Sequence, residues 1–292
     1  MTSGTASGMT ARVPAWTLAV TAMLSVQLGA ALSVHLFPLV GAAGTAWLRL
    51  VAGGLLLLVL VRPRPRDFTR EVIPAVLALG VTTAVMTVAF LAALERIPLG
   101  TTVAIEFLGP LTVAAARAHA RRMLVWPALA MVGVVLLTRP WLGQVDALGV
   151  GFAALAAAGW GTYILLTQHV GDRVAGLNGL AVTIPIAAVA ALPVGLPQAA
   201  GGLDAEVVLA AFGLAVLLPV LPLSLEMLAL RRLTASTFGT LMALEPGFAV
   251  IIGALLLDQL PAPLQVLGVA LVVVAGIGAE RRGHRPPPIL PG

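Results

Sequence analysis

Residues 94–111 read LERIPLGTTVAIEFLGPL, and this stretch decides the fold. Beyond the turn at its start, it carries a single carboxylate, Glu106, within a helix that lipid would otherwise tolerate. It closes on Gly109-Pro110, a pair that weakens a helix because proline has no backbone N–H. Ionisable groups inside apolar helices are costly and usually functional, so Glu106 marks a candidate site.

A second stretch at residues 230–247, LRRLTASTFGTLMALEPG, repeats the pattern of the first. Pro246 lies 136 residues after Pro110, and neighbouring positions match at the same offset. The glutamates do not superpose, since Glu245 falls three positions later in its copy than Glu106 does. The sequence therefore predicts a duplicated membrane unit whose two copies carry carboxylates at staggered depths.

The composition identifies the chain as an integral membrane protein. Hydrophobic residues make up 60% of the 292 residues and charged residues only 10%, and the mean hydropathy is +1.05. A globular surface needs about 25% charged residues. There is no cysteine, which excludes disulfides and thiolate metal sites, and we expect no metal or cofactor. The net charge of +5 comes from arginines in short loops, so we expect no nucleic-acid partner.

We expect an all-α membrane protein with ten transmembrane helices. A helix needs about 20 mainly apolar residues to cross the hydrocarbon core. An uncleaved span explains the long first run better than a signal peptide does. The candidate spans lie near 15–36, 43–61, 73–94, 99–116, 123–138, 147–168, 177–196, 207–230, 236–257 and 262–279.

The arginines predict how these helices are oriented. With a cytoplasmic N-terminus, fourteen of the 17 basic residues fall in inside segments: Arg12, Arg62, Arg64, Arg66, Arg70, Arg117, Arg121, Arg122, Arg173, Arg231, Arg232, Arg281, Arg282 and Arg285. Outside loops hold Arg96 and Arg139 only, and Arg49 lies within the second span. This asymmetry predicts an even number of spans and two cytoplasmic termini, in the segments 1–14 and 280–292. We expect the Pro-rich tail at 280–292 to be disordered.

Ten spans in two copies give five spans per copy, and an odd number inverts the second copy relative to the first. The predicted repeats cover residues 15–140 and 146–279. Their matched arginines agree with an inversion, because Arg96 lies in an outside loop and Arg232 in an inside one. Inverted repeats place a site near the bilayer midplane and permit alternating access.

Several segments resemble a known family of carriers. They are HLFPLVGAAGTAWLRL (35–50), IPLGTTVAIEFLGPL (97–111), GWGTYIL (159–165), LPLSLEMLALRRL (221–233) and TFGTLMALEP (237–246). The chain resembles the drug/metabolite transporter superfamily, in its ten-span type with two EamA-like repeats, and within it the threonine/homoserine exporter branch. The resemblance covers nearly the whole chain. It implies a bacterial inner-membrane carrier that exports small neutral amino acids, driven by the proton gradient.

The buried glutamates are the main candidates for chemistry. Glu106 and Glu245 approach the midplane from opposite sides, so one can bind a substrate ammonium and either can take up a proton. Pro110 and Pro246 lie beside them, and we expect both prolines to weaken the helix near the carboxylates. The alternative is that each glutamate is a protonated, hydrogen-bonded structural residue.

Two further charged residues lie inside predicted spans. Arg49 can receive a substrate carboxylate or pair with Glu106, or it can extend to the outer headgroups. Glu226 follows Pro219 and Pro222, which predict a kinked or broken helix. It can act at an inner gate or pair with a following arginine.

Three uncharged polar side chains complete the candidate set. Trp160 and Tyr163 share a face of the sixth span and can contact substrate or serve only for packing. Gln27 is a mid-membrane amide that can contact substrate or hydrogen-bond between helices.

The alternatives are a carrier for another small metabolite or drug, a membrane-embedded lipid-modifying enzyme, and a channel or scaffolding subunit. An enzyme would need clustered catalytic residues, but the chain has no Asp pair, no HExxH and no Gly-x-Ser-x-Gly. A scaffold would not need buried carboxylates. Because the repeat supplies both halves of a path in one chain, both a monomer and a homodimer are compatible with the sequence.

Overall fold

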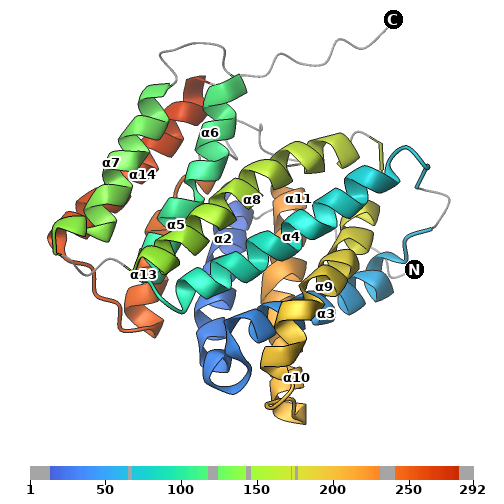
Figure 1. The fold of residues 1–292 in the computed structure, drawn as a ribbon. Coiled ribbons are helices and arrows are strands. Elements are labelled where there is room, and N and C mark those ends of the chain that lie inside the picture. Colours follow the sequence, from blue (N-terminus) through green and yellow to red (C-terminus); the bar gives the residue numbers. More distant parts are fainter. Residues whose placement is uncertain are drawn as a thin grey trace, which may run out of the picture.

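The fold is a bundle of helices (Figure 1). The computed structural model describes residues 14–64, 68–117, 124–142, 146–171, 173–174, 177–230 and 241–282. Within these ranges every regular element is a helix. The all-helical fold class predicted from composition is therefore confirmed for the described part of the chain.

The helices follow the predicted segments closely. In the first half they are α2 (Ala15–Ser33), η1 (Val34–Leu36), α3 (Phe37–Val61), α4 (Ile73–Leu94), α5 (Leu99–Glu106), α6 (Leu108–Arg117), α7 (Val125–Thr138) and η4 (Pro140–Leu142). In the second half they are α8 (Ala147–Gly171), α9 (Asn178–Ala199), α10 (Ala205–Ala215), η5 (Val216–Val220), α11 (Leu221–Leu230), α13 (Glu245–Leu256) and α14 (Pro263–Arg282). Each of the ten predicted segments contains helix among its described residues.

Three of the predicted segments are interrupted where the sequence places proline. The fourth is broken at Phe107, between α5 and α6, and the ninth is broken at residues 243–244, just before α13. The eighth passes from α10 to α11 through a π-helical turn, in which Leu218 adopts an extended conformation before Pro219. Proline removes a helix hydrogen bond and clashes with the preceding turn, which explains why the breaks lie beside these prolines.

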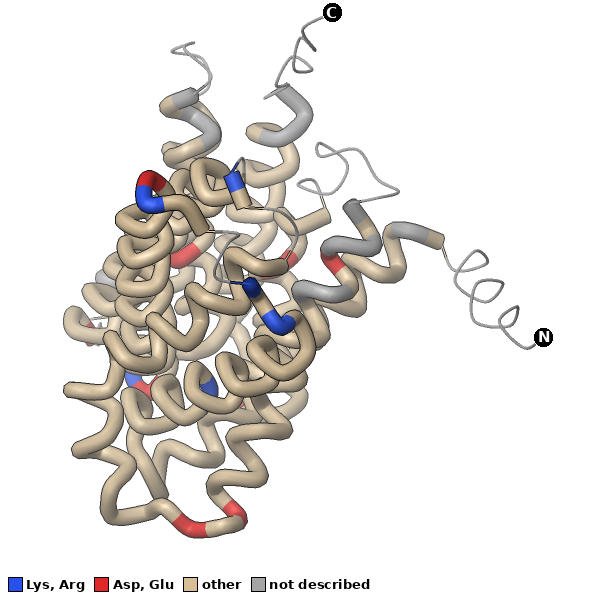
Figure 2. Tube along the Cα trace, turned by 90° about the vertical axis from the view of Figure 1, so that its right-hand side faces the viewer, with Lys and Arg blue, Asp and Glu red and all other residues tan. Residues whose placement is uncertain are grey.

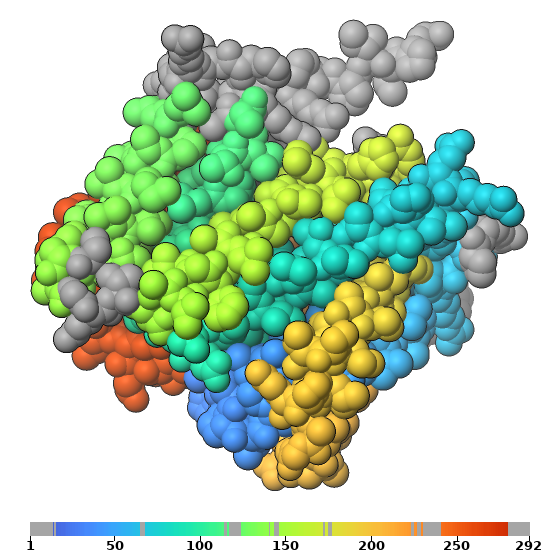
Figure 3. Space-filling view, viewed as in Figure 1, coloured from blue at the N-terminus to red at the C-terminus, as the bar shows by residue number. Residues whose placement is uncertain are grey.

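Helices at corresponding positions of the two halves pack against each other. The pairs α3 with α9, α7 with α14 and α5 with α13 are all in contact. The contact of α4 with α8 corresponds to that of α11 with α2. In Figure 3, α4 and α8 lie side by side across the face that is shown.

The interior is built from small residues, which let backbones approach closely. A Cβ on Gly268 would lie 2.6 Å from the Gly133 carbonyl oxygen, so the contact between α7 and α14 requires glycine. Buried alanines contribute to every main cluster of the core except the one that joins α4 to the end of α8.

The outer surface is apolar, as a lipid-facing surface should be. Large side chains such as Val189, Leu209 and Leu255 are more than two-thirds exposed, at 71%, 72% and 71%. Figure 2 shows long uncharged stretches of the trace between its few charged positions. Four helical stretches are long and apolar enough to cross a membrane: Trp16–Val61, Ile73–Leu94, Ala147–Gly171 and Asn178–Ala199.

Candidate functional site

A cavity of about 280 Å³ lies among the helices of both halves. Its walls are largely apolar and include Leu50, Phe90, Val103 and Ile184. Polar and ionisable side chains from α2, α3, α5, α8, α11 and α13 interrupt these walls. A small concave site with a few convergent polar groups is the usual form of a small-molecule site.

The six residues that the sequence predicts to contact a substrate all line this cavity. They are Gln27, Arg49, Glu106, Trp160, Tyr163 and Glu245. Glu226, predicted as a coupling or gating residue, lines it as well. Pro110 and Pro246 are not part of the lining, so any influence they have on the cavity acts through the backbone.

Glu106 is the last residue of α5 and is partly buried. The helix stops there because Pro110, four residues on, has no N–H to donate to the Glu106 carbonyl. Phe107 forms the turn, and α6 resumes at Leu108. The proline thus places the carboxylate at a helix end beside the cavity.

Glu245 is the first residue of α13, and only 4% of its surface is exposed. Pro246 follows it and cannot donate a hydrogen bond to the carbonyl of Met242, another cavity residue. The interruption at Ala243 lies 136 residues after the one at Phe107. The offset found in the sequence therefore recurs in the helix breaks. The predicted start of this span, at 236, lies outside the described residues.

Arg49 lies at the middle of α3, and 4% of its surface is exposed. Its Nη1 donates to Ser33 Oγ at 2.9 Å, and the Ser33 hydroxyl donates to the Gly29 carbonyl at 2.6 Å. Its Nε is buried without a hydrogen-bond partner. Among the described residues, no carboxylate lies within the 4.0 Å that an ion pair requires. The predicted pair with Glu106 is therefore not formed in this structure, while the predicted contacts with a substrate carboxylate or with headgroups stay predictions.

Glu226 lies in α11, the helix that follows the break at Pro219, and it is partly buried. The kinked helix predicted from Pro219 and Pro222 is confirmed by the extended Leu218. The arginines at 231 and 232, predicted as structural partners of Glu226, lie outside the described residues.

An aromatic contact supports one wall of the cavity: Trp160 lines it, and Phe107 packs behind Trp160 without lining it. The ring of Trp160 meets that of Phe107 edge to face, with centroids 6.1 Å apart and an interplanar angle of 69°. Phe107 occupies the turn directly after Glu106, so this contact fixes the broken part of the fourth segment against α8. Sequence reasoning included Trp160 but missed Phe107.

One wall of the cavity was also missed from the sequence. Thr83, Met86, Thr87 and Phe90 of α4 all line it. Their spacing of i, i+3, i+4 and i+7 places them on one helix face. The spacing was therefore a usable signal, but none of these residues is charged and none stands out in an apolar helix.

The acidic and basic side chains of the lining, apart from the phenol of Tyr163, are three carboxylates and one guanidinium. In the part of the chain that the structure describes, no group of three His, Asp or Glu residues is arranged to hold a metal ion. Because its wall carries side chains of both signs, the site can bind a small molecule that carries both charges, and it can hold protons on its carboxylates.

Three glutamines of the second half form hydrogen bonds to the first half at one end of the bundle. Gln198 Oε1 accepts from the Ala43 N–H at 2.9 Å, near the start of α3. Gln259 Oε1 accepts from the Leu99 N–H at 2.8 Å, at the start of α5. Gln265 Nε2 donates to the Leu137 carbonyl of α7 at 3.0 Å. We call these the glutamine contacts.

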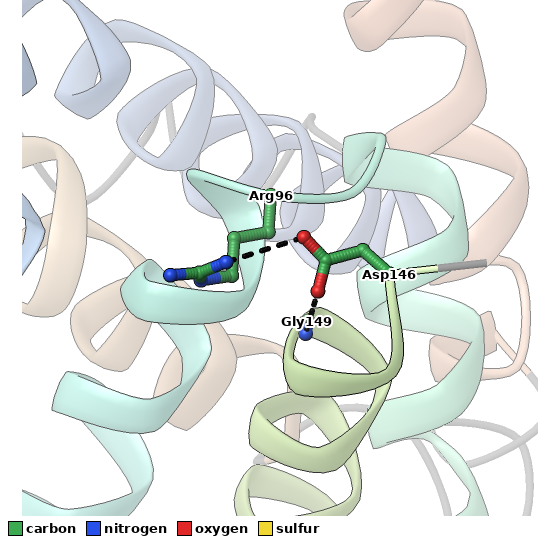
Figure 4. A network of polar contacts seen from close by, with 3 residues as sticks. All are labelled: Arg96, Asp146 and Gly149. Carbon is green, nitrogen blue, oxygen red and sulfur yellow. Dashed lines mark hydrogen bonds and ion pairs between the residues drawn. The ribbon is translucent and has the colours of Figure 1, made fainter. Parts of the chain in front are cut away.

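An ion pair lies in the loops beside the glutamine contacts (Figure 4). Asp146 accepts from the Gly149 N–H at 2.8 Å and from Arg96 Nη1 at 3.3 Å. The hydrogen bond from Gly149 is the main reason that the pKa of the Asp146 carboxyl lies below its ordinary value, and Arg96 lowers it further. This pair joins the loop before α5 to the start of α8.

Comparisons with known proteins decide the family. A profile described as the EamA-like transporter family matches residues 147–278. The threonine/homoserine exporter RhtA of Salmonella typhimurium strain LT2 is 37% identical over 290 residues, which cover 97% of each chain. The protein of the same name from Escherichia coli strain K12 is 37% identical over 280 residues, 93% of this chain and 94% of the relative. The chain belongs to the EamA-like transporter family.

This EamA-family transporter is accordingly an integral protein of the bacterial inner membrane. Its relatives are named as exporters, so the alternative of a lipid-modifying enzyme is set aside. The family assignment agrees with the resemblance drawn from the sequence segments. The matched residues 147–278 nearly coincide with the second repeat that the sequence predicts.

Proposed function

We propose that this EamA-family transporter exports small neutral amino acids such as threonine and homoserine, by alternating access coupled to protons. The observation that carries the proposal is Arg49, a buried cation on the cavity wall with no anionic partner among the described residues. An unpaired buried charge is costly, and the carboxylate of an amino acid would compensate it. The names of the two relatives supply the substrate class.

The opposite charge of the substrate has partners in the same cavity. Glu106 and Glu245 both line it and can bind an ammonium group while Arg49 binds the carboxylate. At about 280 Å³ the cavity lies at the lower end of the sizes common for ligand pockets. Its size and charge pattern together favour a small zwitterion over a bulky drug.

The charge count of the cavity supports coupling to protons. The lining holds one arginine and three glutamates, Glu106, Glu226 and Glu245. A bound zwitterion adds no net charge to this set. Carboxylates left without a cation in an apolar environment are costly. Protons are the simplest counter-charge, and their release on one side of the membrane would link transport to the proton gradient.

The arrangement of the helices supports alternating access between two inverted repeats. Corresponding helices pair across the halves, and the helix breaks recur at the 136-residue offset. The cavity lining reaches Leu180, near the start of α9, whereas the glutamine contacts lie at the end of the bundle where α9 finishes. With ten spans and both termini cytoplasmic, as the arginines favour, the closed end is the outer one.

The test is a transport assay with the purified protein in proteoliposomes, using a panel of labelled amino acids with and without an imposed pH gradient. We expect threonine and homoserine to be carried and their accumulation to follow the gradient. Transport of a non-amino-acid metabolite or drug instead would favour the alternative substrate class. Accumulation that ignores the pH gradient would contradict proton coupling.

A further inference from the structure

Gln27 presents an unused hydrogen-bonding group at the cavity. It lies in the middle of α2, lines the cavity, and only 2% of its surface is exposed. Its Oε1 is buried and has no hydrogen-bond partner among the described residues. A buried acceptor that is left unpaired is unfavourable, so this atom needs a donor.

Other glutamines of the chain show how unusual this is. The Oε1 atoms of Gln198, Gln259 and Gln265 each accept a backbone N–H, at 2.9, 2.8 and 3.0 Å. The interpretation of Gln27 as a hydrogen-bonding link between helices required the same kind of bond. Because no described residue donates to its oxygen, this structure shows no such bond for Gln27, and its predicted roles stay predictions.

The surroundings of Gln27 indicate which donor it can take. Substrate ammonium and carboxylate groups are drawn to the ionised side chains, because hydrogen bonds between charged partners are the stronger ones. The other two residues of α2 that line the cavity, Val26 and Ala30, offer no competing polar side chain. A neutral donor on the substrate, such as a hydroxyl, is therefore the group left for an amide oxygen.

The position of Gln27 relative to Arg49 fits this role. Arg49 donates to Ser33 of the same helix α2, and Ser33 lies six residues after Gln27. That separation is about 9 Å along the helix axis. The guanidinium and the amide thus both lie beside α2, and both residues line the cavity that a single small molecule would occupy.

We infer that Gln27 binds the side-chain hydroxyl of the substrate and makes the transporter selective for hydroxyl amino acids over apolar ones of equal size. The inference rests on the proposed function and adds the residue that sets its specificity. A purely apolar wall distinguishes such isosteres poorly, whereas a site that hydrogen-bonds a hydroxyl rejects an analogue lacking it. Threonine against valine, and homoserine against norvaline, are the matched comparisons.

The experiment measures uptake of the four amino acids, each labelled, into proteoliposomes with wild type, Gln27→Met and Leu24→Met. Methionine keeps the length of glutamine without the amide, and Leu24 lies on the exposed side of the same helix. We expect wild type to prefer threonine over valine by at least about tenfold, the effect of one hydrogen bond of about 1.4 kcal/mol. Gln27→Met should lower this ratio toward one, and Leu24→Met should keep it.

Three outcomes would overturn the inference. Equal transport of threonine and valine by wild type would refute hydroxyl recognition while the proposed amino-acid export stands. An unchanged ratio in folded Gln27→Met would assign the recognition to another residue. Transport of none of the four amino acids by wild type would remove the proposed function along with the inference. The first and third outcomes need only wild type, so they do not depend on whether the variant folds.

Discussion

At the scale of single residues, the two glutamates at the helix breaks carry the proposed coupling. We predict that Glu106→Gln or Glu245→Gln abolishes threonine transport, because glutamine keeps the shape but neither binds an ammonium as an ion pair nor exchanges a proton. Uptake into proteoliposomes should fall about 100-fold or more, as expected for the loss of a charged hydrogen bond of about 3 kcal/mol. Glu95→Gln, at an exposed carboxylate outside the cavity, is the control and should leave transport intact. Normal threonine and homoserine export by both variants would refute their role.

The proposed binding of an amino acid depends also on the charge of Arg49. Arg49→Met should weaken threonine binding about 10- to 100-fold, because a charged hydrogen bond to the substrate carboxylate is lost. The apparent KM for threonine measures this. Arg49→Lys should recover only part of the affinity, since lysine is a point charge without the planar fork of arginine. The control is Arg173→Met, at an exposed arginine bonded to the His169 carbonyl. An unchanged KM in Arg49→Met would show that a group other than Arg49 binds the substrate carboxylate.

The sequence predicted the ionisable part of the site because charges inside apolar helices are conspicuous. Glu106, Glu245 and Arg49 were found in this way, and all three line one cavity. The sequence did not single out Thr83, which lines the cavity, or Phe107, which packs against Trp160, because neither differs in type from the residues around it. The sequence also could not predict that Arg49 has no ion-pair partner among the described residues, because pairing depends on helices distant in the chain.

At the scale of elements, the proposed alternating access predicts that the glutamine contacts hold the closed end of the bundle. Gln259→Ala removes the acceptor of the Leu99 N–H and should shift the protein toward opening at that end by about 2- to 10-fold, as for one hydrogen bond. Thr101 is 4% exposed near this contact, so the labelling rate of Thr101→Cys reports the opening. Leu260→Ala, at a residue that is 83% exposed in the same loop, is the control. Equal labelling rates in both backgrounds would exclude a gating role for Gln259.

The Asp146–Arg96 pair has a predictable pH range. A carboxyl with a lowered pKa contributes stability above its ordinary value of about 3.9, and this contribution is lost only as pH falls through the lower value in the folded protein. The Asp146 carboxyl therefore does not titrate between pH 5 and 8. Asp146→Asn should leave the shape of the transport–pH profile in that range unchanged. A profile that shifts by a pH unit or more would show that Asp146 takes part in coupling.

Helices and their breaks were largely readable from the sequence, because apolar length and proline act locally. Phe107 and Leu218 lie where Pro110 and Pro219 predict an interruption. The packing of α3 against α9 could not be predicted from the sequence. Its interface is made mostly of alanine, glycine and branched aliphatic residues that occur in almost every helix of this chain, and such residues do not specify a partner.

At the scale of the whole molecule, the orientation of the repeats determines whether one cavity can serve both sides of the membrane. Because the chain has no cysteine, single cysteines can be introduced without background labelling. Thr69, between α3 and α4, and Leu203, between α9 and α10, are both exposed, and the arginine distribution puts them on opposite sides. In intact cells a membrane-impermeant maleimide should label Leu203→Cys but not Thr69→Cys, and permeabilised cells should show both labelled. Labelling of Thr69→Cys but not of Leu203→Cys in intact cells would reverse the orientation, and labelling of both would contradict the ten-span topology. A reversed orientation would put the glutamine contacts on the cytoplasmic side and remove the proposed path for export.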